Sequence, residues 1–192
     1  MSKVQKNKIK KESSLISSAF ELFSTKGINE TSISNIVHKA GVAKGTFYLY
    51  FKDKYDILNK IILNKSSNLL IESMNATKSK NFTNYEESVL FFIDYIIEYF
   101  NNNKFMLKLI YKNLSWGILK KASNEYEGIH EIYDFFMTLY KDSAINQQDV
   151  EKTLFIIIEL VGSVCYSSII LNEPDNIDKM KPILFDTIKK II

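Results

Sequence analysis

Residues 41–54 read Gly-Val-Ala-Lys-Gly-Thr-Phe-Tyr-Leu-Tyr-Phe-Lys-Asp-Lys. Gly41 ends one short apolar-periodic segment and a second opens near Ala43–Lys44, with Phe47 and Phe51 spaced four apart on the face to be buried. Two short helices joined by a glycine-containing turn form a helix-turn-helix, whose second helix fits the major groove of DNA. An ordinary corner between helices is the alternative, and the neighbouring lysines and tyrosines favour the first interpretation.

The segments before this stretch support it. Apolar residues between Leu15 and Phe23 recur with a helical period, and Gly27 ends that helix. Either Thr31 or Ser32 is the N-cap of the next helix, because the Glu or Gln of a full capping box is missing. Five lysines among residues 3–11 form a basic leader, which we interpret as a solvated tail, with a minor-groove arm as the alternative.

The whole chain of 192 residues is predicted to be all-α, with about nine helices. It holds only six glycines and two prolines, and long stretches without such breakers favour helices. We expect a helix-turn-helix domain over 1–52 and a larger helical ligand-binding and dimerisation domain over 53–192. Residues 75–84 are rich in Asn, Ser, Thr and Lys and predict a loop. Further helices are expected at Tyr85–Phe100, Phe105–Leu114, Tyr126–Lys141, Asp149–Leu171 and Asn176–Ile192, with a bend at Trp116-Gly117.

The charge is unevenly distributed. Residues 1–65 carry twelve lysines against five acids, a net of +7, whereas residues 66–192 carry a net of −4. A basic first third joined to an acidic remainder indicates a part that binds a polyanion and a part that does not. The single cysteine excludes an intramolecular disulfide, and the charged N-terminus lacks an apolar signal core, so we expect a cytoplasmic protein.

One apolar run, Leu154–Leu171, is long enough to be tested as a membrane span. Glu159 lies inside it, and a central carboxylate costs roughly 2.5–3.5 kcal/mol on insertion scales. We therefore expect a buried helix of a soluble protein and no membrane partner.

A dense set of positions matches a known family. They are Ala19, Leu22, Phe23, Gly27, Thr31, Ser32, Ile33, Ile36, Ala40, Gly41, Val42, Gly45, Thr46, Phe47, Tyr48, Tyr50, Phe51, Lys54 and Leu58. With them, residues 9–58 resemble the DNA-binding domain of TetR-type transcriptional repressors. Two positions depart from the family: Val37 stands where alanine is usual, and Tyr50 where histidine is common.

The motif supplies candidate DNA contacts. Lys44 can reach a guanine edge, Gly45 allows close approach, and Thr46 can meet a thymine methyl or a phosphate. Phosphate contacts are expected from Tyr48, Tyr50 and Lys54, the last resembling the family's phosphate-binding lysine. Thr31, Ser32 and Ser34 complete the set at a helix N-terminus, which favours anions. The alternative roles are purely structural: Thr31 or Ser32 caps the helix, and Tyr48 packs against the first helix.

The resemblance also implies a homodimer built from the last two helices, and so a palindromic operator. Gly162, Ser163 and Ser167 would permit close approach of helices. The expected interface residues are Ile158, Gly162, Ser163, Cys165, Ser167, Ile170, Ile183 and Leu184.

A small hydrophobic or aromatic effector is expected among the central helices. Aromatics at helical spacing are more often core, so fewer than half of the candidates should line a pocket. Glu159 either balances a cationic ligand or makes a polar contact between subunits. The candidates are Phe92, Tyr95, Tyr99, Met106, Tyr111, Trp116, Tyr133, Phe136, Met137 and Tyr140.

The sequence thus predicts a ligand-responsive transcriptional regulator, a repressor released from a double-stranded DNA operator by a small molecule. No catalytic arrangement, metal site or cofactor is expected, because His38 and His130 have no partner at ligand spacing. Two alternatives within the same prediction are a transcriptional activator and a regulator that responds to a protein partner. The alternative from another class is a helical carrier of hydrophobic ligands, or an enzyme, with an inert motif.

Overall fold

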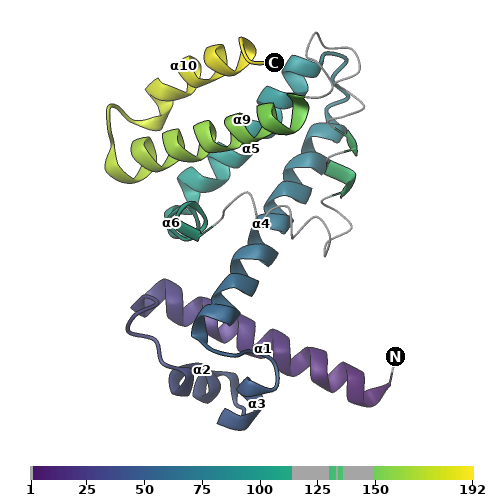
Figure 1. Ribbon diagram of the computed structural model, residues 1–192, viewed down its shortest axis with the longest axis vertical. Coiled ribbons are helices and arrows are strands. Elements are labelled where there is room, and N and C mark those ends of the chain that lie inside the picture. The colour runs from purple at the N-terminus through teal and green to yellow at the C-terminus, as the bar shows by residue number, and fades with distance from the viewer. Residues whose placement is uncertain (1, 114–129, 133, 136–148) are drawn as a thin grey trace. The chain divides into compact units, whose positions relative to one another are not determined.

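Every regular element among the described residues is a helix, and the predicted all-α fold class is confirmed. The computed structural model describes residues 2–113, 130–132, 134–135 and 149–192, and it has no strand within these ranges (Figure 1). Backbone contacts divide the chain into two units, Met1–Asn64 and Lys65–Ile192. The elements are α1 Lys3–Lys26, α2 Ile33–Ala40, α3 Lys44–Tyr48, α4 Lys54–Ser79, α5 Tyr85–Asn102, α6 Lys104–Asn113, α9 Val150–Cys165, the π-helix η2 Tyr166–Leu171 and α10 Ile177–Lys189.

Helix α1 begins much earlier than its apolar stripe. Its core-facing residues start at Leu15 and include Ala19 and Phe23, as the periodicity predicted. The basic leader is not an irregular tail, because helix runs from Lys3 with Ser2 as its N-cap. Gly27 ends the helix with a φ of +86°, a conformation that side chains disfavour.

The start of α2 settles the choice between two N-caps. The Ser32 hydroxyl accepts a hydrogen bond from the Asn35 amide at 3.1 Å, and the Ser32 amide donates to the Asn35 side chain at 3.0 Å. Asn35 therefore supplies the capping-box partner that we expected only from Glu or Gln. Ser32 is the cap, and Thr31 is not.

The turn between α2 and α3 is shaped by Gly41 in the left-handed conformation, with φ 67° and ψ 33°. The Val42 amide donates to the Val37 carbonyl at 3.0 Å, which is the long bond of a Schellman motif. Helix α3 then buries Phe47 completely, and Phe51 follows it into the core. Both predictions for this turn, the glycine stop and the buried phenylalanine pair, are confirmed.

Helix α4 extends into the segment that was predicted to be a loop. It runs through Ser79, so the loop expected from residue 75 is wrong over its first half. Thr77 is buried, and its hydroxyl donates to the Ser73 carbonyl at 2.8 Å, which satisfies a polar side chain inside the helix. The polar composition was a misleading indication of a loop, because the hydroxyls of Ser73 and Thr77 lie on the buried face of α4.

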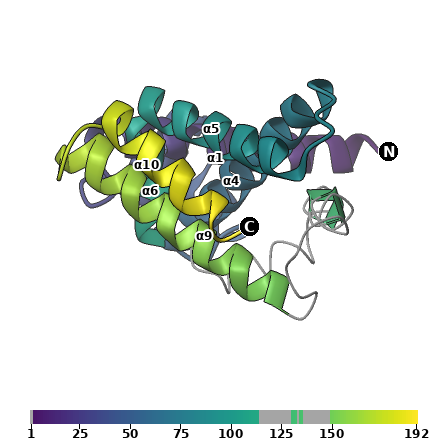
Figure 2. The ribbon, with the colours of Figure 1, turned by 90° about the horizontal axis from the view of Figure 1, so that it is seen from above.

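The second unit is built on α5, α6, α9, η2 and α10, which contact one another (Figure 2). Lys181 of α10 forms ion pairs with Asp94 and Glu98 of α5 and so ties these two helices together. The five described residues within the predicted helix Tyr126–Lys141 are helical. The remainder of that helix and the bend at Trp116-Gly117 lie outside the described residues.

Helix α9 and η2 include the apolar run tested above. Among the described residues, Lys152–Leu171 is the one helical stretch long and apolar enough to cross a membrane. Such a stretch is also common in the cores of soluble proteins, and here it packs against α5, α6 and α10. Only 28% of its apolar window is buried, which is less than the fully buried helix we expected.

Candidate nucleic-acid interface

Helix α3 presents an exposed tip above a buried anchor. Lys44 and Gly45, on its first turn, are exposed, and Thr46 is half-buried. No side chain caps its start, so the Phe47 ring supplies the main tertiary hold on this short helix. An exposed lysine, next to a glycine without a side chain, on the first turn of an anchored helix is suited to contact base edges in the major groove.

Two exposed side chains, Tyr48 and Leu49, lie beside the tip. Tyr48 is exposed and packs edge-to-face on Phe47, with ring centroids 5.5 Å apart, so its hydroxyl remains available as a donor. Leu49 is 78% exposed and was missed by the sequence analysis. The signal was present, because Phe47 and Phe51 define the buried face and Leu49, midway between them, must point away from it. Leu49 can offer apolar contact to a thymine methyl group.

The Tyr50 hydroxyl makes a hydrogen bond within the first unit. The hydroxyl donates to the Lys8 carbonyl of α1 at 3.2 Å, across 42 residues of sequence. In this structure the residue predicted to donate to phosphate links the turn after α3 to the first helix.

Thr31 is a correction. Its side chain is 1% exposed, and its hydroxyl donates to the Gly27 carbonyl at 2.7 Å. A hydroxyl buried in this way cannot reach DNA. Ser32 and Ser34 are exposed at the start of α2, although the Ser32 hydroxyl also donates to Asn35 at 2.7 Å.

Lys54 makes contacts within the first unit that the sequence did not predict. Its amine donates to the carbonyls of Ile28, Asn29 and Thr31 at 2.9, 3.2 and 3.3 Å. All three carbonyls belong to the connection between α1 and α2. The lysine predicted to hold a phosphate therefore closes a loop, with its charge already solvated by backbone oxygens.

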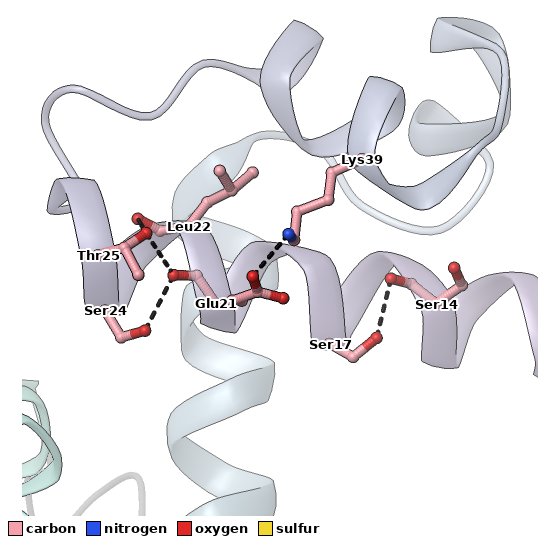
Figure 3. A network of polar contacts seen from close by, with 7 residues as sticks. All are labelled: Ser14, Ser17, Glu21, Leu22, Ser24, Thr25 and Lys39. Atoms are coloured by element: carbon pink, nitrogen blue, oxygen red, sulfur yellow. Dashed lines mark hydrogen bonds and ion pairs between the residues drawn. The ribbon is translucent and has the colours of Figure 1, made fainter.

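Helices α1 and α2 are joined by polar contacts at their surface (Figure 3). The Lys39 amine meets a Glu21 carboxylate oxygen at 2.6 Å, and the Ser14 hydroxyl donates to the Ala40 carbonyl at 3.2 Å. Exposed pairs of this kind contribute little to stability, about 0–1 kcal/mol. Their effect is to fix the register of α2 on α1, which orients the turn that follows.

The predicted ligand residues in the second unit are divided. Phe92 and Met106 are buried, Tyr95 and Tyr99 are half-buried, and Tyr111 is partly exposed. Burial, and then the nearby Glu72 carboxylate, raise the pKa of Tyr99, so its hydroxyl stays protonated. Tyr111 stacks on Tyr166 with centroids 4.4 Å apart. The five other candidates, Trp116, Tyr133, Phe136, Met137 and Tyr140, lie outside the described residues.

The predicted dimer residues fall into two groups. Ile158, Ser163 and Ile183 are exposed on α9 and α10, and Gly162, Ser167 and Ile170 are half-buried. Cys165 and Leu184 lie in the core of the subunit, which corrects their assignment to an interface. Burial raises the pKa of the Cys165 thiol to about 12. The sequence analysis also missed the exposed Phe155 and Ile156, which extend the apolar surface of α9.

The first unit thus defines a class of protein. A short helix, a left-handed glycine turn and a second helix with an exposed basic tip, supported by a third helix, form the helix-turn-helix of DNA-binding proteins.

Comparisons with known proteins narrow this class. Residues 15–61 match the model of the bacterial regulatory proteins of the tetR family. The chain is 28% identical over 187 residues to the HTH-type transcriptional regulator YvdT of Bacillus subtilis, covering 92% of each protein. It is also 28% identical over 123 residues to an HTH-type regulator of Staphylococcus aureus, covering 64% of this chain and 63% of that one. Together these comparisons support a TetR-type transcriptional regulator.

Solved structures share the fold. FadR of Bacillus subtilis, in complex with stearoyl-CoA, has a TM-score of 0.67 at 21% identity and covers 93% of this chain and 98% of its own. FadR of Thermus thermophilus, a TetR-family repressor in complex with lauroyl-CoA, has a TM-score of 0.68 at 15% identity and covers 94% of both. At these identities the likeness concerns the fold.

Proposed function

We propose that this chain is a cytoplasmic, ligand-responsive repressor that binds a palindromic DNA operator as a homodimer and is released by a small hydrophobic effector. The observation that carries the proposal is the exposed Lys44–Gly45 tip of α3, held on buried Phe47. The surrounding segment, residues 1–65, has a net charge of +7. Such a unit attracts the phosphate backbone and presents side chains to base edges. We retain 1–52 as the DNA-binding domain and 53–192 as the domain for ligand and partner subunit.

The direct test is selection of bound duplexes from a random pool by the full-length protein. We expect enrichment of a sequence with two-fold symmetry and half-sites about one DNA turn, roughly 34–36 Å, apart. Binding should weaken steeply with added salt. If no duplex binds in a salt-dependent manner, the carrier or enzyme alternative replaces this proposal.

Lys44 should read a base rather than hold a phosphate. Replacing Lys44 with alanine should relax the preference at one position of each half-site, at a cost of about 1–3 kcal/mol on the specific duplex. Binding to random duplex should change much less. Titration of both duplexes measures the two effects, and equal losses on both would refute the assignment of Lys44 to base reading.

The dimer proposed here uses the exposed apolar side chains of α9 and α10. Isolated exposed apolar residues are normal on a protein surface, but Phe155 and Ile158 lie one turn apart on α9, and Ile183 on α10 is 61% exposed. Exposed apolar side chains on two helices that contact each other fit a protein partner. Two copies related by a two-fold axis would bury the same surface on each subunit.

Replacing Ile183 with glutamate should therefore shift the protein from dimer to monomer. The reason is that a carboxylate would have to be buried without a partner in the interface. Sedimentation at several protein concentrations measures the shift, and Leu49→Glu, an equivalent exposed substitution in the first unit, should leave the dimer mass unchanged. An unchanged mass for Ile183→Glu would place the interface elsewhere.

A molecule with a long apolar part is the effector we propose. The two FadR structures, which share this fold, hold acyl-CoA molecules. Phe92 and Met106 offer apolar surface, and the protonated Tyr99 hydroxyl offers a polar contact. An effector can release the operator only to the extent that it binds the DNA-free state more tightly. Repeating the duplex selection with stearoyl-CoA, stearate or coenzyme A alone separates the acyl chain from its carrier.

A further inference from the structure

The first three turns of α1 form a feature that the family match does not cover. The family model begins at Leu15, whereas α1 begins at Lys3. Residues 3–14 extend about 18 Å at 1.5 Å per residue. Residues 2–11 are exposed throughout. In Figure 1 this end of α1 projects beyond α2 and α3.

This extension is held in place despite burying almost nothing. Ser2 and Gln5 form a capping box, with bonds of 3.1 and 3.2 Å, which satisfies free amides at the helix start. The Tyr50 hydroxyl donates a hydrogen bond to the Lys8 carbonyl, and the Ser14 hydroxyl donates one to the Ala40 carbonyl at the end of α2. The extension is therefore tied to the turn that follows the recognition helix α3.

The charge of the extension is unbalanced. Residues 2–11 contain five lysines and no acid. Lys3 and Lys6, Lys6 and Lys10, and Lys8 and Lys11 repel one another, because residues three or four apart are neighbours on a helix. No ion pair involves these lysines among the residues that the structure describes. A helix that buries little and repels itself gains most from a polyanion lying beside it.

The lysines occupy two faces of the helix. Lys11 and Lys8 lie four and seven residues before Leu15, so they continue the stripe that faces the core farther along α1. Lys6 and Lys10, with Ile9 and Ser13, line a shallow open groove on another face. The first face is on the side of the helix-turn-helix, and the second turns away from it.

We propose that the N-terminal extension of α1 binds the phosphate backbone of duplex DNA next to the stretch that α3 contacts, through Lys8 and Lys11. This inference rests on the proposed DNA-binding function. A lipid surface is disfavoured, because a membrane-bound helix needs a broad apolar face and residues 2–11 offer only Val4 and Ile9. Tyr50 acts as a positioning residue, since it holds the extension against the end of α3.

A pair of charge-matched double variants tests the proposal in the full-length protein. Lys8→Gln with Lys11→Gln removes the two lysines on the face toward the helix-turn-helix, and Lys6→Gln with Lys10→Gln removes two from the other face. Operator affinity is measured against salt concentration for both variants and the wild type. The first variant should flatten the slope of log K against log salt by about two units, and the second by less than one. Base preference should be unchanged in both, because phosphate contacts carry no sequence information.

The outcomes separate the two proposals. A wild type that does not bind duplex DNA removes the proposed function and this inference with it. A wild type that binds, with an unchanged slope for Lys8→Gln/Lys11→Gln, overturns only the inference. Equal flattening by both variants also overturns it, because it would indicate diffuse attraction instead of an oriented face. Loss of binding to anionic vesicles by the first variant, with its DNA slope intact, would assign the extension to a membrane surface.

Discussion

Replacing Phe47 with alanine should lower the free energy of unfolding of the first unit by about 3–5 kcal/mol and abolish operator binding. Helix α3 has five residues and no side-chain cap, so it cannot persist by its own propensity. The fully buried Phe47 ring, 5.6 Å from the Phe51 ring, holds it in place. Chemical denaturation followed by circular dichroism, together with duplex titration, measures both effects.

Two variants control this experiment. Phe47→Leu keeps most of the buried volume and should retain part of the stability and binding. Leu49→Ala truncates a neighbour that is largely exposed, so it should leave stability within about 0.5 kcal/mol of the wild type. A Phe47→Ala protein as stable as Leu49→Ala would contradict the packing of α3 described above.

The parts of this site that follow local rules were predictable. A helical period of 3.6 identifies Phe47 and Phe51 as one buried face, and a glycine between two short periodic segments predicts a left-handed turn. Gly41 and both phenylalanines occupy these roles in the structure. Such features depend on residues within one turn of each other, which the sequence displays directly.

The parts that depend on distant contacts were not predictable. Tyr50 reaches Lys8 across 42 residues, and nothing near either residue signals the bond. The burial of Thr31 likewise depends on where α1 ends, because its hydroxyl bonds to carbonyls of Leu22 and Gly27. A hydroxyl at a helix start has the same local pattern whether it caps, binds an anion or fills a core.

Lys54 illustrates how one residue type suits two roles, a phosphate contact and hydrogen bonds to backbone carbonyls. An amine on the first turn of α4 suits a phosphate, and the family resemblance implied that contact. The same amine donates to three carbonyls of the connection between α1 and α2, at 2.9–3.3 Å. Hydrogen bonds from a charged donor contribute about 1.5–3 kcal/mol each in favourable settings, less where solvent competes.

Replacing Lys54 with methionine should therefore destabilise the first unit by about 2–3 kcal/mol, because the carbonyls of Ile28, Asn29 and Thr31 lose their shared donor. The apolar stem is retained, so the loss is assigned to the amine. Lys52→Met, at an exposed lysine two residues earlier, should change stability by less than about 0.5 kcal/mol. Under conditions where both variants are folded, the salt dependence of operator binding by Lys54→Met should equal that of the wild type. A Lys54→Met protein that is as stable as the wild type and has a salt slope flatter by about one unit would instead support a phosphate contact of Lys54. It would also show that the amine is not needed to hold the connection between α1 and α2.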